Sequence, residues 1–226
     1  FAFELAVIVR EGIRRMYQEG ENIFYYITLY NENYPMPPLP DDPAVPEGIV
    51  RGAYWWRPRG GDGAPVDLLA SGSIMQQAIA AADRLQELGY APAIWSVTSY
   101  VELAREAEAC ERAARLKPLE PRPVPYVEKL FASTPGPVVA ASDYQKALPG
   151  SIARWMPAAF TVLGTDGFGL SESRPDLRDH FEVSARHILQ ASLAGLHREG
   201  LIDAETLAAQ LAELDVPVGK ANPADR

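Results

Sequence analysis

Residues 66–117 contain the same pattern twice, and this repetition limits the fold more than any other feature of the chain. An apolar strand over 66–72 precedes an amphipathic helix over 73–89, and a strand over 91–99 precedes a helix over 99–117. Strands that alternate with helices pack as a mostly parallel sheet with helices on both faces. The sequence therefore predicts an α/β fold, a three-layer doubly wound domain.

The two predicted helices also carry the same start signal. Ser73 is followed three residues later by Gln76, and Ser99 by Glu102, so each helix is expected to begin with a capping box. Gly89 is expected to end the first helix, as glycine commonly does. Agreement between the capping signals and the hydrophobic period supports two strand–helix units in series.

The rest of the chain continues the alternation less regularly. Further strands are expected at 137–142, 160–165 and 180–183, a short helix near 125–132, a helix over 144–156 interrupted at Pro149, and two final helices capped by Ser184 and Asp203. The tail from residue 215 onward is expected to be loose.

The first 57 residues do not show this alternation of strands and helices. Residues 3–18 predict a helix that ends at Gly20, and the aromatic and β-branched run at 22–30 predicts a buried strand. Six prolines in the twelve residues 35–46 exclude a helix or a central strand there and indicate a semi-rigid linker. Residues 48–57 predict a short strand at a sheet edge.

Composition narrows the class of protein. The 226 residues carry a formal net charge of -9 without a cluster of Lys or Arg, which argues against a nucleic-acid partner. One cysteine, Cys110, indicates a reducing compartment, so a cytoplasmic protein is expected.

No apolar run approaches the roughly 20 residues that cross a bilayer, so no membrane partner is expected. The chain starts inside an amphipathic pattern at Phe1, which suggests a piece of a longer protein.

No phosphate-binding motif fits this sequence. The first strand of the repeat ends in Gly72 alone, where a dinucleotide fold needs Gly-x-Gly-x-x-Gly, and a P-loop is absent from the sequence. Gly-Asp-Gly at 61–63 lacks the Asn-rich segment of a thiamine-type metal motif and is expected to be a turn. The loop 162–174 has glycines at spacings that suit no phosphate loop. It is expected to be a structural or interface turn that carries Asp166 and Ser171, with substrate contact as the less favoured alternative.

The remaining reactive side chains form no recognisable centre either. His187 and His197 lie on one predicted helix about 15 Å apart, too far to share a metal ion with each other. Together with His180 they do not form the spacing of a metal-binding motif. Ser73 and Ser171 lack a Gly-x-Ser-x-Gly nucleophile elbow. No catalytic, cofactor-binding or metal-binding residue is therefore assigned.

The stretch "YNENYPMP" at 30–37 places polar and aromatic side chains side by side. Glu32 stands between two asparagines at the end of an aromatic run, and eight of the chain's 21 aromatic residues fall between Phe24 and Trp56. Such density indicates a large surface that is buried or covered by a partner. Two interpretations of Glu32 stay open here, an interface anchor, which is favoured, and a site residue.

Several blocks in order along the chain, including "ENIFYYITLYNENY", "WSVTSYVEL" and "VLGTDGFGLSESR", resemble the C-terminal part of the homodimeric pyruvate dehydrogenase E1 component, in the transketolase-like superfamily. The resemblance implies a transketolase C-terminal-like domain over 48–226. It also implies that residues 1–47 hold the last helix and strand of a pyrimidine-binding domain and a Pro-rich linker. An active-site histidine of some members corresponds to Pro35, which transfers no proton.

The resemblance further implies a whole enzyme that uses thiamine diphosphate and Mg²⁺, with ligands outside this segment. It would decarboxylate pyruvate and acetylate the lipoyl group of its partner, the E2 dihydrolipoyl acetyltransferase, as a dimer of two E1 subunits. Glu32, Tyr34 and Asp166 are then candidate interface or channel residues. The alternatives are a non-catalytic assembly or effector-binding module, and the E1 of another 2-oxo acid dehydrogenase.

Overall fold

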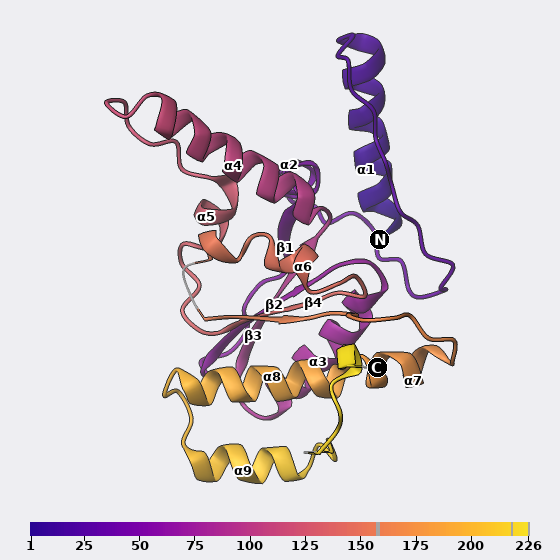
Figure 1. Ribbon diagram of the computed structural model, residues 1–226, viewed down its shortest axis with the longest axis vertical. Coiled ribbons are helices and arrows are strands. Elements are labelled where there is room, and N and C mark those ends of the chain that lie inside the picture. Colours follow the sequence, from indigo (N-terminus) through magenta and orange to yellow (C-terminus); the bar gives the residue numbers. More distant parts are fainter. Residues whose placement is uncertain (157–158, 218, 226) are drawn as a thin grey trace.

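A five-stranded sheet forms the centre of the computed structural model, which describes residues 1–156, 159–217 and 219–225 (Figure 1). The strand order is β1-β3-β2-β4-β5; β1 runs antiparallel to β3, and the other neighbours are parallel. The strands are β1 (Ala53–Arg57), β2 (Pro65–Ala70), β3 (Ala91–Val97), β4 (Val138–Ala141) and β5 (Phe160–Leu163). The predicted mostly parallel sheet is confirmed, and the strand expected within 48–57 lies at an edge as β1.

Helices cover both faces of this sheet, which confirms the three-layer arrangement (Figure 1). One face carries α3 (Met75–Glu87) and α8 (Ala185–Arg198), with α9 (Ala204–Ala212) outside α8; the other carries α4 (Tyr100–Leu116), α5 (Tyr126–Phe131) and α6 (Ala147–Gly150). Successive strand residues point to opposite faces, so Leu68 of β2 packs in the α3–α8 cluster and Leu69 in the α4–α5 cluster. Because both faces are covered, the central strands are mostly apolar. The buried Asp67 of β2 is an exception, and it accepts a hydrogen bond from Trp95 Nε1 at 2.8 Å.

The expected helix caps are confirmed at two positions. The Ser99 side chain accepts a hydrogen bond from the Glu102 N–H at 3.1 Å, and the Asp203 carboxylate accepts one from the Thr206 N–H at 2.7 Å. Ser184 precedes α8, as expected, but its hydroxyl contacts His187 Nδ1 at 2.8 Å instead of a helix N–H.

The capping box expected at Ser73 is wrong. Gly72 adopts φ +54°, and the chain forms a 3₁₀ turn over Gly72–Ile74 before α3 begins at Met75. Ser73 is therefore buried inside this turn and does not cap the helix. The tight turn at the end of β2, which the local capping pattern does not reveal, decides the start of the helix.

Two expected strands do not form. Residues 22–30 have no strand partner among the described residues and run as an extended segment. At 180–183, helix α7 (Arg174–His180) ends and Glu182 adopts φ +60° in a turn. Aromatic and β-branched residues favour an extended backbone, but a strand also requires a neighbour to complete its hydrogen bonds. The helix expected over 144–156 is reduced to α6 and a 3₁₀ turn at Ala153–Trp155.

The proline-rich linker is shorter than expected because helix α2 (Ala44–Arg51) begins inside it. Pro43 immediately precedes this helix, and Pro46 lies in its first turn, where no intrahelical N–H donor is needed. Residues 48–51 are accordingly helical and not part of the edge strand. Gly52 ends α2 with φ +107°, and an added Cβ there would lie 2.6 Å from the Ser99 carbonyl oxygen.

The C-terminal tail was expected to be loose. Most of its described residues are exposed, but it contacts the end of α7 through Lys220. Lys220 Nζ donates to the carbonyl oxygens of Asp179 and His180 at 2.5 and 2.8 Å, at the end of α7. Helix C-termini present unpaired carbonyl groups that attract cations, so a lysine can dock there. In the described part of the tail, residues 219–225, a final 3₁₀ turn spans Pro223–Asp225.

The N-terminal helix extends away from the sheet (Figure 1). Its first turns are held by a small apolar cluster with α2 and β1 and by one buried carboxylate. α1 (Ala2–Ile13) continues as a π-helix over Arg14–Gln18, and the extended segment that follows returns along it, with Tyr25 against Gly12. Glu4, 8 % exposed, accepts hydrogen bonds from the Tyr54 hydroxyl at 2.9 Å and the Ser96 hydroxyl at 2.5 Å. This carboxylate joins α1 to strands β1 and β3.

Replacing Glu4 with alanine is expected to lower the free energy of unfolding by about 2–4 kcal/mol, because two buried hydroxyl donors lose a charged acceptor. Denaturant titration followed by tryptophan fluorescence would measure the loss. Glu11→Ala removes a carboxylate that pairs with Arg14 on the outer part of the same helix and should cost less than about 1 kcal/mol. Equal losses for the two variants would contradict the anchoring role.

Candidate functional site at the carboxyl edge of the sheet

The parallel strands direct their carboxyl ends to one edge, and the chain reverses its order there. From β2 the chain passes through α3 to β3 on one side of β2, and after α4 it returns to β4 on the other side. The carboxyl ends of β2 and β4 therefore flank the topological switch point, where ligands bind in doubly wound folds. Gly72 follows β2 at this place, and Asp143 follows β4.

The chain itself fills the switch point with Tyr30. The Tyr30 hydroxyl donates a hydrogen bond to Asp143 Oδ1 at 2.9 Å, and its ring lies against Gly72. A Cβ added at Gly72 would lie 2.5 Å from that ring, so only glycine permits this approach. The hydroxyls of Ser71 and Ser142, which directly precede Gly72 and Asp143, are 3.2 Å apart and join the ends of the two strands.

The Tyr30–Asp143 pair lies in a half-buried environment that disfavours charge. Burial raises the pKa of the Asp143 carboxyl above its usual range, and the hydrogen bond from Tyr30 partly opposes this rise. Burial, followed by the charge of Asp143, raises the pKa of Tyr30 as well. Because the pKa of Asp143 is raised, its stabilising contribution is complete at low pH and decreases as the pH rises through that pKa.

Helix α7 holds the next residues of the extended segment over the same edge. Arg178 contacts Glu32 Oε2 at 2.5 Å and also donates to the Ser73 hydroxyl at 3.2 Å. Arg174 donates to Asn31 Oδ1 at 2.9 Å and lies 3.5 Å from Glu32. The Glu32 carboxylate is thus fixed between two guanidinium groups, with its side chain 18 % exposed.

These two arginines were not recognised in the sequence. Arg174 and Arg178 are four residues apart, so they share one face of a helix. That spacing is a usable signal only once residues 174–180 are known to be helical, and the strand expected at 180–183 obscured it. Nothing in the local sequence pairs this helix with a segment about 145 residues earlier.

Tyr34 lies against the start of the chain at Phe1. Its ring makes an edge contact with the Phe1 ring at a centroid distance of 6.3 Å. Burial raises the pKa of the Tyr34 hydroxyl, and the charges of Glu4 and Glu32 raise it further. The segment therefore bridges the N-terminal helix and the carboxyl edge of the sheet.

Asp166 reaches the carboxyl edge from the loop after β5. Its Oδ1 accepts from the Lys146 N–H at 2.9 Å, and its Oδ2 lies 3.7 Å from Lys146 Nζ. The Thr165 N–H bonds the Tyr144 carbonyl at 2.9 Å. These contacts link the loops after β4 and β5. Beyond them, Phe168 is 82 % exposed at the tip of the loop.

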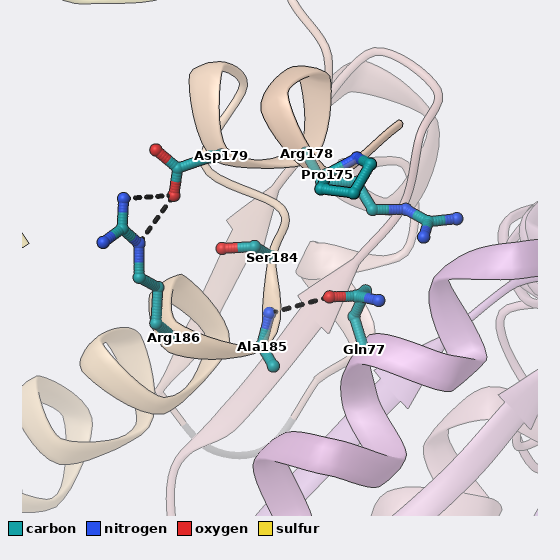
Figure 2. Close-up of a pocket in the computed structure, with 7 residues that line it drawn as sticks. All are labelled: Gln77, Pro175, Arg178, Asp179, Ser184, Ala185 and Arg186. Carbon is teal, nitrogen blue, oxygen red and sulfur yellow. Dashed lines mark hydrogen bonds and ion pairs between the residues drawn. The ribbon is translucent and has the colours of Figure 1, made fainter. Parts of the chain in front are cut away.

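A cavity of about 300 Å³ opens beside this edge, between α7 and the start of α8 (Figure 2). Its polar groups are paired with one another: Gln77 Oε1 accepts from the Ala185 N–H at 3.1 Å, and Arg186 Nε donates to Asp179 at 2.6 Å. Figure 2 shows Arg178 and Asp179 extending to opposite sides. Arg178 therefore serves the Glu32 contact rather than the Arg186–Asp179 pair.

The histidines form no centre in the described part of the chain, where no group of three His, Cys, Asp or Glu side chains could hold a metal ion. His187 is buried with Nδ1 on Ser184, and burial lowers its pKa, as does the nearby charge of Lys220. Over those same residues, no helix is both long and apolar enough to cross a bilayer.

The fold and its filled carboxyl edge define an α/β domain of the doubly wound class. The family model "Transketolase-like TK C-terminal domain" matches residues 52–184, more than half of the chain, and the chain belongs to this family. A second family model, "Pyruvate dehydrogenase E1 component middle domain", matches residues 1–37. The domain boundary expected between residues 47 and 48 stays a prediction.

Curated relatives match almost the whole chain. The pyruvate dehydrogenase E1 component of Escherichia coli K12 is 42 % identical over 226 residues, covering 99 % of this chain and 25 % of the relative. That of Mycolicibacterium smegmatis is 44 % identical over 216 residues, covering 94 % and 23 %. The expected resemblance is confirmed, and the chain spans about a quarter of the length of these relatives.

Among solved structures, a transketolase from Campylobacter jejuni is 22 % identical, with a TM-score of 0.44, and covers 64 % of this chain and 18 % of that one. The family assignment rests on the family model and the sequence relatives, not on this superposition.

Replacing Gly72 with alanine should displace Tyr30 from the crevice. The variant combines strain at a positive φ with overlap against the ring, so we expect a loss of about 3 kcal/mol in the free energy of unfolding. Chymotrypsin should also cleave the segment around Tyr30 faster. Gly89→Ala is the matched control, because Gly89 has φ +87° and open space around an added Cβ; it should cost only about 1 kcal/mol. If both variants resist chymotrypsin as well as the parent protein does, the contact between the Tyr30 ring and Gly72 does not hold the segment in place.

Proposed function

We propose that this chain is the C-terminal part of a thiamine diphosphate-dependent pyruvate dehydrogenase E1 component. The observation that carries the proposal is the 42 % identity over 99 % of the chain to a protein of that name. The whole enzyme would decarboxylate pyruvate and reductively acetylate the lipoyl group of the E2 dihydrolipoyl acetyltransferase. It would act in the cytoplasm as a dimer of two E1 subunits.

The residues of this chain do not fit a cofactor diphosphate and its Mg²⁺. Mg²⁺ prefers an octahedral set of oxygen ligands, and no such carboxylate cluster occurs among residues 1–156, 159–217 and 219–225. Gly-Asp-Gly at 61–63 precedes β2, so it lies at the opposite edge of the sheet from Tyr30. The crevice of the switch point is occupied by Tyr30. We therefore assign the cofactor ligands to other parts of the enzyme and this chain to a supporting role.

Glu32, Tyr34 and Asp166 are proposed as residues of the subunit interface or of the channel to the active centre. The strongest support concerns Glu32, which two arginines hold in one orientation at the carboxyl edge. A carboxylate that is held by charge on one side and remains partly exposed on the other is positioned to contact a further group. Pro35 offers no ionisable side chain in place of the histidine of some relatives, so acid–base chemistry is not assigned to that position.

Residues 1–47 are proposed as the end of a pyrimidine-binding domain with its linker. Exposure alternates along the extended segment. Phe24 and Tyr26 are each 87 % exposed, whereas Ile23 and Tyr25 are partly buried. This alternation is typical of a strand with one covered face. The match of residues 1–37 to the middle-domain family supports the same assignment.

The purified 226-residue chain is expected not to bind thiamine diphosphate in the presence of Mg²⁺, because it lacks the diphosphate site. Isothermal titration calorimetry would measure this directly. The full-length protein should bind the cofactor and release CO₂ from pyruvate in the same buffer. Micromolar binding by the 226-residue chain would show that the cofactor site is assigned to the wrong part of the enzyme.

In the full-length enzyme, Glu32→Ala separates the two roles proposed for this residue. A fall in pyruvate turnover of about tenfold or more, with the dimer intact by analytical ultracentrifugation, would assign Glu32 to the channel. A weaker dimer at unchanged specific activity of the assembled enzyme would assign it to the interface. Glu47→Ala, which removes an exposed glutamate paired with Arg51 on α2, is the control and should change neither. If Glu32→Ala also changes neither, both roles are wrong.

A further inference from the structure

The C-terminal tail contacts the helix that holds Glu32. Lys220 Nζ donates to the carbonyl oxygens of Asp179 and His180 and lies 3.6 Å from Glu182 Oε1, so its ammonium group is shared among acceptors at the end of α7. The side chain of Lys220 is only 21 % exposed. A lysine in this position adds a charged donor to the carbonyl groups at the end of the helix, where the Asp179 oxygen also accepts from the Glu182 N–H at 3.2 Å.

Helix α7 needs such support because it is only seven residues long. A helix of this length is unstable by itself, so contacts at its ends and sides determine its orientation. Ser173 caps its first turn by accepting from the Asp176 N–H, and Lys220 binds its last carbonyl groups. Arg178, which contacts Glu32, directly precedes Asp179, whose carbonyl oxygen Lys220 binds.

The same tail supports the loop that carries Asp166. Gly167 adopts φ +82°, and a Cβ added there would lie 3.2 Å from the backbone of both Pro223 and Ala224. The tail residues 219–225 therefore contact both segments at the carboxyl edge, α7 and the loop after β5. We name residues 219–225 the C-terminal brace.

We propose that the C-terminal brace positions Glu32 through α7, and that Lys220 is its principal positioning residue. Lys220 does not contact Glu32; it fixes the end of α7, and α7 carries Arg174 and Arg178 to the carboxylate. The structural part of this inference stands on these contacts alone, and only its effect on turnover rests on the function proposed above.

Hydrogen exchange of the full-length protein, followed by mass spectrometry, tests the structural part. In Lys220→Met, backbone exchange at residues 31–34 and in α7 should rise by about tenfold, while exchange in the core helix α3 stays unchanged. Lys117→Met removes a lysine that pairs with Glu120 at the exposed end of α4 and should leave residues 31–34 unchanged. Faster exchange in α7 alone, without a change at residues 31–34, would overturn the proposal.

A double-mutant cycle with pyruvate turnover tests the positioning part. Lys220→Met should lower kcat by about fivefold, whereas in the Glu32→Gln background it should lower kcat by less than about twofold, because the residue that it positions is already altered. Lys220→Arg, which keeps a cationic donor, should recover most of the loss. If Lys220→Met lowers kcat by the same factor in the parent and in the Glu32→Gln background, the two residues act independently and the proposal is overturned. If the parent protein does not turn over pyruvate but the hydrogen-exchange prediction is confirmed, the proposed function is rejected. The structural role of the C-terminal brace is then still supported.

Discussion

The shared edge of four parallel strands is the constraint on which the rest of the structure depends. Parallel register brings the carboxyl ends of β2 and β4 together and opens a crevice between them at the switch point. In this chain the crevice is filled from within, because Gly72 leaves room for the Tyr30 ring and Asp143 accepts its hydroxyl. The segment 22–30, which was expected to be a strand, runs along α1 and covers the sheet edge only with its last residue, Tyr30.

Charge pairing extends this cover beyond Tyr30. The Glu32 side chain is partly covered at this edge, and a partly buried carboxylate is stabilised by a cation beside it. Arg178 supplies that cation from α7, and Lys220 secures the end of α7 from the tail. Three segments that lie far apart in the sequence thereby depend on one another. This dependence explains how a short helix and a chain tail can together hold one carboxylate at the carboxyl edge of the sheet.

Much of the fold could be predicted because its information is local. The strands β2 and β3 and the helices after them follow from apolar period, and the caps at Ser99 and Asp203 follow from a spacing of three residues. The errors fall where a distant contact overrides a local preference. Residues 22–30 have strand composition but no ladder partner among the described residues, and the capping signal at Ser73 is overridden by the turn at Gly72.

The sequence by itself determined the α/β class, the alternation of buried strands and amphipathic helices, and the absence from the printed sequence of standard phosphate-binding motifs. It also singled out Glu32, Tyr34 and Asp166, but without their neighbours. Only the tertiary structure decided that Tyr30 fills the switch point, that two arginines hold Glu32, and that Lys220 secures their helix. The physical reason is that periodicity and capping act over a few residues, whereas ion pairs and close packing form between side chains that only the folded chain brings together.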